Sequence, residues 1–275
     1  MTTDTIRRAF ALTPRENPLC AVITGATGGI GEAFARALPE ETDLVLTGRD
    51  EEKLSALAAE FGTRATTVKA DLTTAEGITA VAEAADAKEC DLLINNAGLG
   101  EYGEFLDAPF EKHRTALRVN NEAVLELTHT IVPPMLERAD MSGRRAGLIN
   151  VASSLAFFPV PTFAIYAATK AMILSFSESF AAEMSDRPID VLVACPGAVK
   201  TEFGQRAGYS GGSMPGAMAP DKVASEALAA LGRQSTVVIG PASAAAFAPV
   251  AFARSLFGQA FMRANRVMQR VSDRG

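Results

Sequence analysis

The chain has 275 residues, of which 48% are hydrophobic and 21% charged, and its net charge is -6. This size and composition are typical of a globular protein with one large domain or two small ones. The acidic balance argues against nucleic acid as the main partner, and no apolar run reaches the roughly 18 residues of a membrane-spanning helix.

The N-terminal residues and the cysteines indicate a reducing environment. The opening MTTDTIRRAF lacks the apolar core of a secretory signal, so we expect a cytoplasmic protein. Cys20, Cys90 and Cys195 are widely spaced and odd in number. Cys20 and Cys195 lie in apolar runs, which predicts buried thiols, and the pattern indicates neither a disulfide framework nor a metal site.

Apolar strands alternate with helices along the chain, after a polar N-terminal tail over residues 1–18. The expected strands cover 19–24, 43–47, 65–70, 91–95, 147–152, 189–194 and 236–239. The expected helices cover 30–38, 51–60, 74–85, 108–136, 163–184 and 221–231, and the fourth should be irregular near Pro133 and Pro134. Continuous apolar strands separated by helices predict one α/β domain over 19–240, built on a doubly wound parallel sheet of about seven strands with helices on both faces.

A glycine-rich turn, Thr24-Gly-Ala-Thr-Gly-Gly-Ile-Gly31, follows the first strand. In such a turn Gly25 can reverse the chain tightly, Gly29 lets the backbone approach a pyrophosphate, and Gly31 allows close packing of helix on strand. The helix that begins there presents free N–H groups to an anion. Glycines also close ordinary turns, but this position after the first strand predicts a dinucleotide-binding loop.

The second strand ends Thr47-Gly-Arg-Asp50, where an acidic side chain would favour a ribose diol and an arginine a 2′-phosphate. Gly48 leaves room, and the guanidinium of Arg49 can bind a phosphate with two hydrogen bonds. The alternative is that Arg49 is a solvated residue and that Asp50 caps the next helix. We expect NADP(H) to be favoured over NAD(H).

Tyr166 and Lys170 are four residues apart on an expected helix and therefore share one face. A tyrosine with its usual pKa of about 10 is a poor base at neutral pH, and a nearby ammonium or an oxidised nicotinamide would lower that pKa. Ser153 lies just past a strand, at the sheet edge where ligands gather, and its hydroxyl could polarise a substrate oxygen. Alone, a Tyr/Lys pair at this spacing is usually a surface feature.

Several motifs in order make the sequence resemble the short-chain dehydrogenase/reductase family over residues 19–240. They are TGxxxGxG at 24–31, NNAG at 95–98, YxxxK at 166–170 and PGxVxT at 196–201. The resemblance implies a Rossmann-type fold and hydride transfer between nicotinamide and an alcohol or carbonyl carbon. The stretches 95–105 and 174–178 look like a subgroup of bacterial reductases that resembles hydroxysteroid and long-chain 3-ketoacyl reductases.

The resemblance also implies roles for individual residues. Tyr166 would be the general acid/base, Lys170 would lower its pKa and hold the nicotinamide ribose, Ser153 would orient the substrate oxygen, and Asn120 would organise a water relay to Lys170. Asp71 would lie near the adenine. The implied cofactor-binding residues are Thr24, Gly25, Thr27, Gly28, Gly29, Ile30, Gly31, Arg49, Asp71, Leu72, Asn96, Ala97, Gly98, Tyr166, Lys170, Pro196, Gly197, Val199 and Thr201.

The resemblance has one departure and one implication for assembly. Many NADPH-dependent members carry a basic residue inside the glycine loop, where this chain has Ala26 and Thr27. Arg49 would then hold the phosphate nearly alone. Family members are commonly dimers or tetramers, so a homodimer or homotetramer is expected.

The expected substrate loop covers 200–218 and is rich in glycine, with Phe203, Tyr209, Met214 and Met218 as its apolar members. It could close as a flap over a neutral, apolar carbonyl compound, or it could be an ordinary surface loop. Lys200 and Arg206 are the only cations nearby that could bind an acidic substrate.

Residues 241–275 form a basic C-terminal extension with a net charge of +4, which leaves -10 on the rest. We expect Pro249 to interrupt its first part and the second part to form an amphipathic helix. This helix could lie on an anionic membrane surface, roof the substrate site or cover a partner subunit. His113 and His129, on the long central helix, receive neither a metal-binding nor a proton-transfer role.

The favoured function is therefore an NADP(H)-dependent oxidoreductase acting on a small-molecule carbonyl or alcohol. An NADP(H)-sensing binding module is the alternative from a different class, although the presence of Tyr166 and Lys170 favours the enzyme. A membrane-surface lipid carbonyl reductase would share the chemistry and differ in location.

Overall fold

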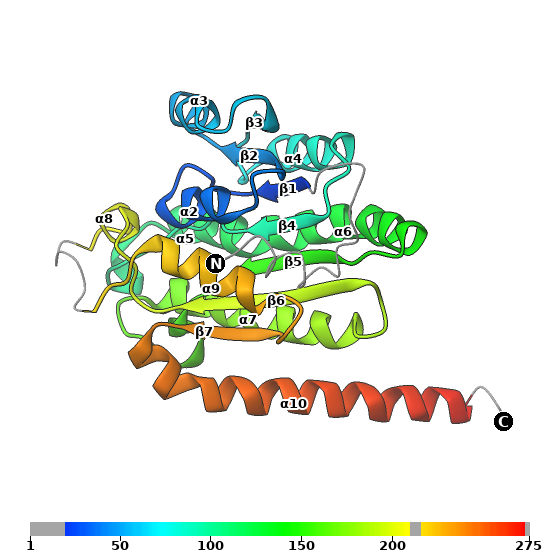
Figure 1. Cartoon of the computed structure of the whole chain (residues 1–275). Helices are drawn as coiled ribbons and strands as arrows, with labels where there is room; N and C mark the ends of the chain where they lie inside the picture. Colours follow the sequence, from blue (N-terminus) through cyan, green and yellow to red (C-terminus); the bar gives the residue numbers. More distant parts are fainter. Residues whose placement is uncertain (1–19, 210–215, 273–275) are drawn as a thin grey trace.

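Seven parallel strands form one sheet at the centre of the chain (Figure 1). The computed structural model describes residues 20–209 and 216–272, with side chains described as far as Met262. Neighbouring strands pair in the order β3-β2-β1-β4-β5-β6-β7, and every pair is parallel. The strands are β1 (Cys20–Ile23), β2 (Asp43–Gly48), β3 (Ala65–Lys69), β4 (Leu92–Asn95), β5 (Ala146–Val151), β6 (Ile189–Pro196) and β7 (Thr236–Ile239). The predicted fold class, a doubly wound single domain, is confirmed.

Helices cover both faces of the sheet because its central strands are buried on both sides. On one face, α2 (Gly29–Ala37), α3 (Glu51–Ala59) and α9 (Pro220–Ala230) pack their apolar residues on the sheet. The other face is covered by α4 (Ala75–Ala87), α6 (Ala123–Ser142) and α7 (Ala164–Glu183). Every residue of β1, β4 and β5 is buried, which explains why these strands appear in the sequence as continuous apolar runs. The shorter elements are α5 (Phe110–Leu117), α8 (Phe203–Arg206) and η1 (Gly62–Arg64), η2 (Phe105–Asp107), η3 (Arg118–Glu122) and η4 (Ser154–Phe157).

The central helix differs from the prediction of one helix over 108–136 with an irregularity at its prolines. It is divided into α5 and α6 by η3, a π-helical segment, and α6 passes through Pro133 and Pro134 without a break. These prolines remove the N–H groups that would bond the carbonyls of His129 and Thr130. Both of those residues are exposed, so water can satisfy their carbonyls. The helix then continues to Ser142, where Gly143 ends it with a φ of +67°.

The C-terminal helix α10 (Pro241–Ser272) is also continuous, although an interruption at Pro249 was expected. The carbonyl left without its donor there belongs to Ala245, which is exposed. Figure 1 shows α10 running beside β7 and extending past the end of the sheet. Within the described part of the chain, no helix has the length and hydropathy required to cross a membrane.

Cys20 and Cys195 are free and buried, as predicted, and Cys90 is free and buried as well. Cys20 begins β1 and Cys90 immediately precedes β4, and their Sγ atoms lie 2.7 Å apart. A disulfide bond would require about 2.05 Å, so the structure holds two thiols in close contact. The hydrogen bond between them raises the pKa of Cys90 far above its usual value.

The sheet order places a topological switch point between β1 and β4. The chain proceeds outward from β1 to β3 and then returns to the other side of β1 to form β4. In open parallel sheets, ligands bind in the crevice beyond the carboxyl ends of the strands at such a point. The glycine-rich turn after β1 and the NNAG motif at the end of β4 both lie there.

Candidate active site

The turn between β1 and α2 has glycines where a side chain would collide with backbone. Gly25 has a φ of +63°, and a Cβ on it would lie 2.9 Å from the Cα of Ala97. A Cβ on Gly31 would lie 2.3 Å from the carbonyl oxygen of Gly25. Gly29 begins α2, whose first N–H groups lack acceptors within the helix and can bind an anion. The turn therefore has the shape and polarity of a pyrophosphate cradle.

Thr24 and Asn96 fasten this turn to the end of β4. The side-chain amide of Asn96 donates to the carbonyls of Thr24 and Gly25, at 2.9 and 3.1 Å. In return, Thr24 Oγ1 accepts the N–H groups of Asn96 and Ala97, each at 3.0 Å. The side-chain amide of Asn96 thus bonds the protein backbone. In the expected cofactor site, Asn96 would therefore act by holding the glycine turn in place.

The tip of β2 lies against the glycine turn. Thr27 Oγ1 lies 3.2 Å from where a Cβ on Gly48 would stand. Arg49 follows and is exposed, and its charge contributes to a lowered pKa of Asp71. The largest cause of that lowered pKa is the hydrogen bond from the backbone N–H of Thr73. Arg49 and Asp71 thus lie close enough for their charges to interact, and their roles toward a cofactor stay predictions.

Asp50 accepts the backbone N–H of Lys53 at 3.0 Å and caps α3. This confirms the capping role considered for it and leaves Arg49 as the exposed cation of the Thr47–Asp50 segment. Asp50 can cap α3 whether Arg49 binds a phosphate or is a solvated surface residue.

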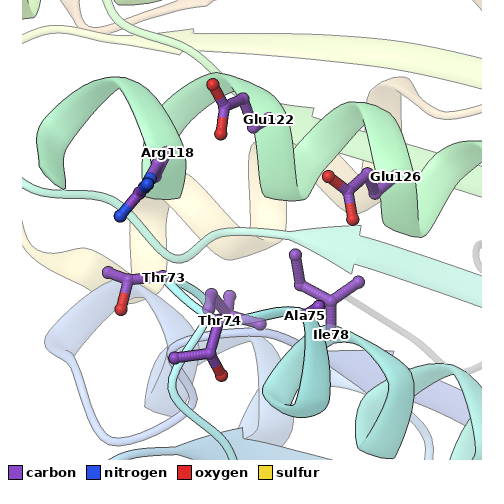
Figure 2. A pocket seen from close by; sticks show the side chains of 8 residues that line it. Thr73, Thr74, Ala75, Ile78, Arg118, Glu122 and Glu126 are labelled. Atoms are coloured by element: carbon purple, nitrogen blue, oxygen red, sulfur yellow. The ribbon is translucent and has the colours of Figure 1, made fainter. Parts of the chain in front are cut away.

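A hollow of about 180 Å³ opens beside Leu72, the neighbour of Asp71. Figure 2 shows its two walls: Arg118, Glu122 and Glu126 on η3 and α6, and Thr73, Thr74, Ala75 and Ile78 on the start of α4 and the turn before it. Leu72 belongs to the expected cofactor set, whereas the remaining lining residues belong to no expected site. The hollow therefore borders the expected adenine end without containing the catalytic residues.

The segment after β6 lies over the glycine turn. Pro196 ends the strand, and the N–H of Gly197 donates to the carbonyl of Ile239 at 2.9 Å. Val199 pairs with Met218 in an isolated parallel bridge. The Cγ2 atom of Thr201 lies 2.7 Å from where a Cβ on Gly29 would stand. The structure thus brings Thr201 beside the pyrophosphate cradle.

Tyr166 and Ser153 meet at the carboxyl edge of the sheet. Tyr166 is in the first turn of α7 and only 8% exposed, and Ser153 directly follows β5. The hydroxyl of Ser153 hydrogen-bonds the Tyr166 phenol, and its Oγ also accepts the N–H of Leu155 at 3.2 Å. The neighbouring Ser154 is buried in η4.

The pKa of Tyr166 contradicts the expected direction. Burial raises it to about 12, and the hydrogen bond with Ser153 lowers it only in part. The sequence predicted a lowered pKa from the ammonium of Lys170, whose Nζ lies 5.9 Å from the centre of the tyrosine ring. At that distance the loss of water around the phenol has the larger effect. The phenol thus holds its proton firmly in the described structure.

Lys170 lies one helical turn further along, with its amine buried beside β5. Its Nζ donates to the carbonyl of Val151 at 2.8 Å, and the residue is 5% exposed. Burial lowers the pKa of Lys170 to about 8. The amine therefore passes from cation to neutral base in mildly alkaline solution.

The π-helical segment η3 brings Asn120 to the same place. Asn120 Oδ1 accepts the N–H of Leu99 at 2.7 Å, and its Nδ2 donates to the Leu99 carbonyl and to Thr169 Oγ1, at 2.9 and 3.0 Å. Asn120 Oδ1 and Lys170 Nζ each lie 3.4 Å from where a Cβ on Gly98 would stand. The adjoining Asn121 donates instead to the backbone carbonyl of Thr169.

Comparisons with known proteins agree with this geometry. Residues 19–209 match the family model described as short chain dehydrogenase. The chain belongs to the short-chain dehydrogenase family. Nodulation protein G of Rhizobium sp. (strain N33) is 37% identical over 195 residues, which cover 70% of this chain and 76% of the relative.

Two solved structures are similar to this short-chain dehydrogenase. One from Sphingobium yanoikuyae in complex with NADPH is 31% identical with a TM-score of 0.77, over 87% of this chain and 94% of that one. The 3-ketoacyl-(acyl-carrier-protein) reductase from Brucella melitensis complexed with NADH is 27% identical with a TM-score of 0.74, over 81% of this chain and 97% of that one. The chain is thus an oxidoreductase of the short-chain dehydrogenase type that uses a nicotinamide cofactor.

Two aromatic rings lie against Tyr166 in this short-chain dehydrogenase. Phe203 on α8 and Phe163 before α7 lie 5.3 and 6.3 Å from the Tyr166 ring, between centroids. Tyr102 contacts both Phe163 and Tyr209, at 5.1 and 5.3 Å. Of the expected substrate loop, Phe203 thus contacts Tyr166 and Tyr209 reaches it through Tyr102 and Phe163, whereas Met218 pairs with Val199 and Met214 is outside the described residues.

The start of α10 lies beside the segment that follows Ser153. Phe247 stacks on Phe157 and Phe158, with centroids 5.3 and 5.2 Å away. The rest of the helix runs along β7 and α7. The expected roof over the substrate site is thus limited to the first turns of the helix.

Two features of the site were missed in the sequence. Cys195 is buried in β6, close enough to Lys170 for their charges to interact, and burial raises its pKa to about 12. His113, given no role, lies 2.8 Å from Glu101 through Nδ1 and bonds the Phe105 carbonyl at 2.9 Å through Nε2. The hydrogen bond with Glu101 raises the pKa of His113. Glu101 and His113 are 12 positions apart on different elements, so helical periodicity gave no signal for the pair.

Proposed function

We propose that this short-chain dehydrogenase interconverts carbonyl compounds and alcohols with NADP(H), using Tyr166 as proton donor and acceptor. The observation that carries the proposal is that Ser153, which is close enough to lower the pKa of the buried Tyr166 phenol, and the buried amine of Lys170, one turn away, lie at the same sheet edge. A purely structural tyrosine would not require a serine and a buried amine at the same sheet edge. Asn120 and the Gly98 backbone complete this group.

The chain's own residues fit a dinucleotide. A side chain at Gly25 or Gly31 would collide with backbone, and one at Gly29 would collide with Thr201, so glycine at these positions allows the tight turn that a pyrophosphate cradle at the N-terminus of α2 requires. Thr24, Thr27, Gly28 and Ile30 would bind or frame the pyrophosphate with these glycines. When bound, the nicotinamide supplies or accepts a hydride at its C4 atom.

The other expected cofactor residues would bind its two ends. Asp71 and Leu72 would hold the adenine. Ala97, Gly98 and Lys170 would contact the nicotinamide ribose. Pro196, Gly197, Val199 and Thr201 would position the carboxamide.

In carbonyl reduction, Tyr166 would donate its phenolic proton to the substrate oxygen as negative charge develops there. Ser153 would donate a second hydrogen bond to that oxygen and stabilise the charge. The cation of Lys170 would favour the phenolate left behind. Asn120 would organise the water through which the proton is replaced.

We infer NADP(H) over NAD(H) from the exposed guanidinium of Arg49 beside the open position of Gly48. Arg49→Ala should raise the dissociation constant of NADPH about tenfold to a hundredfold, because a hydrogen-bonded charge pair is lost, and leave that of NADH nearly unchanged. Titrations of both cofactors measure the difference. An equal loss for the two would overturn the assignment.

A neutral, apolar substrate is favoured by the rings around Tyr166. Phe163 and Phe203 present apolar surface toward the Tyr166 ring, and Tyr102 packs behind Phe163. Arg206 is one of the two nearby cations that could bind an acidic substrate. It forms an ion pair with Glu202, which immediately precedes α8. The substrate loop would close these rings over the carbonyl as a flap.

The deciding experiment is a panel of carbonyl compounds with NADPH or NADH, followed by the fall in reduced-cofactor absorbance. Turnover of apolar ketones or aldehydes with NADPH is expected. An NADP(H)-sensing protein would bind the cofactor and turn over none of them. We also expect a homodimer or homotetramer in the cytoplasm, which size-exclusion chromatography with light scattering and cell fractionation would test.

A further inference from the structure

The outward surface of α10 is apolar and nearly uncharged. Its Val250, Phe252, Leu256, Phe257 and Phe261 are between 47% and 72% exposed. Arg254 is the only charged residue from Pro241 to Met262, and it pairs with Glu178 at 2.8 Å. Exposed apolar side chains so close together indicate a surface that another body covers.

The opposite side of α10 is already packed on the rest of the chain. Phe247, Ala251 and Ser255 follow at intervals of four residues, which places them on one stripe. Phe247 stacks on Phe157, Ala251 is 4% exposed, and Ser255 hydrogen-bonds Ser235 at 2.9 Å. The exposed apolar residues lie outside this stripe, so they are not needed to attach the helix.

The distribution of these residues favours lipid over a partner helix. At 3.6 residues per turn, Val250, Phe257 and Phe261 lie on one flank, and Phe252 and Leu256 lie on the opposite flank. A partner helix would require one apolar stripe on this surface. A bilayer instead contacts the whole outward side of a helix that lies in its interface.

The charge of this part of the chain favours anionic lipid. No aspartate or glutamate occurs from residue 227 to residue 272, and Arg263, Arg266 and Arg270 follow the apolar cluster. Anionic headgroups attract arginines, whereas the acidic remainder of the chain, at -10, would be repelled from them. Figure 1 shows the arginine-bearing end of α10 extending beyond the sheet, where it can reach a surface ahead of the acidic part.

We propose that α10 lies along the surface of an anionic bilayer and holds the enzyme there. No helix in the described part of the chain is both long and apolar enough to cross a membrane, so α10 would bury its apolar side at the level of the headgroups. This location would give the active site access to apolar carbonyl compounds dissolved in the lipid. Membrane binding itself does not depend on the proposed reaction.

The test is co-sedimentation of the full chain with vesicles of phosphatidylcholine alone or mixed equally with phosphatidylglycerol. We expect binding to the mixed vesicles that weakens as salt is raised. Phe257→Ser and Phe261→Ser should each reduce the partition coefficient about tenfold, because each removes one large apolar contact. Met141→Ser is the matched control, since Met141 is 81% exposed at the end of α6, and it should change nothing.

Two results would overturn the proposal. One is the absence of binding to the mixed vesicles, and the other is equal loss in the Met141→Ser control. If the chain without lipid is an oligomer that Phe257→Ser and Phe261→Ser dissociate, and vesicles do not bind, α10 forms a subunit interface instead. Because no cofactor or substrate is present in this assay, its failure leaves the proposed reaction untouched.

Discussion

The two ends of the active site are built by different means. At the cofactor end, hydrogen bonds from Thr24 and Asn96 fix the backbone, and glycines occupy positions with no room for a side chain. At the substrate end, Tyr102 packs on Phe163, and Phe163 and Phe203 pack on Tyr166, mainly through their rings. The backbone of the turn requires glycine at particular positions, whereas the packing between rings tolerates many apolar side chains.

This difference explains why the cofactor end of the site is easier to recognise in a sequence than the substrate end. The turn after β1 is specified by a short motif, and its contacts follow from that motif. The substrate side depends on which rings α8 and the loop after β4 bring to Tyr166. Substitutions at the two ends should therefore separate cofactor binding from substrate choice.

The largest effect is expected where the two ends meet. Tyr166→Phe removes the proton donor and should lower kcat about 10²- to 10⁴-fold, while NADPH still binds. Steady-state rates and a cofactor titration measure the two effects. The matched control is Tyr102→Phe, which removes a hydroxyl from a neighbouring ring and should leave kcat close to the parent value.

Gly31→Ala should damage the cofactor end alone. Its Cβ would lie 2.3 Å from the Gly25 carbonyl oxygen and 2.8 Å from the Cα of Ala26, so backbone must shift. NADPH affinity should fall about tenfold to a hundredfold. Gly258→Ala is the control, because its Cβ would meet only Ala182, at 4.0 Å. An unchanged affinity in Gly31→Ala would contradict the cradle described here.

The pH profile tests the buried amine that links the two ends. Lys170, with its pKa lowered to about 8, is a cation below that pH and loses its charge above it. Because Tyr166 keeps its proton up to a pKa of about 12, only the lysine should titrate in this range. The kcat/KM for reduction should fall about tenfold per pH unit above 8.

Lys170→Arg supplies the control for this profile, since an arginine stays charged over the whole range. If the variant retains measurable activity, its decline should begin at a higher pH. A wild-type profile that stays flat well into the alkaline range would show that this charge is not used.

The smallest effect is expected at the substrate end. Phe203→Ala removes a ring 5.3 Å from that of Tyr166 and enlarges the space above the phenol. The kcat/KM ratio of bulky to small ketones should shift about tenfold, with NADPH affinity unchanged. Phe252→Ala, which alters an exposed ring on α10, should leave this ratio as it is.

The sequence predicted the strands and most helix positions because central strands such as β1, β4 and β5 are buried on both sides and therefore appear as largely apolar runs. It did not predict the π-helical segment at Arg118–Glu122, which accompanies hydrogen bonds between Asn120 and Leu99, 21 positions away. Proline patterns were misleading at Pro133 and Pro249, because exposed carbonyls can bond water.

The site residues were recognisable from motifs, but their electrostatics were not. The raised pKa of Tyr166 depends on how fully neighbouring elements exclude water, and spacing along one helix does not contain that information. The pair of Glu101 and His113 likewise depends on the approach of a loop to α5. Such contacts become visible only in three dimensions.

The most direct test of the account follows the hydrogen itself. NADPH with deuterium at the transferable C4 position would be incubated with the chain and an apolar ketone, and the alcohol would be analysed by mass spectrometry. The account predicts one deuterium on the carbinol carbon and almost none when Tyr166→Phe replaces the parent for the same time. An alcohol formed without deuterium would contradict hydride transfer from the nicotinamide, and equal labelling by Tyr166→Phe would contradict the role given to the tyrosine.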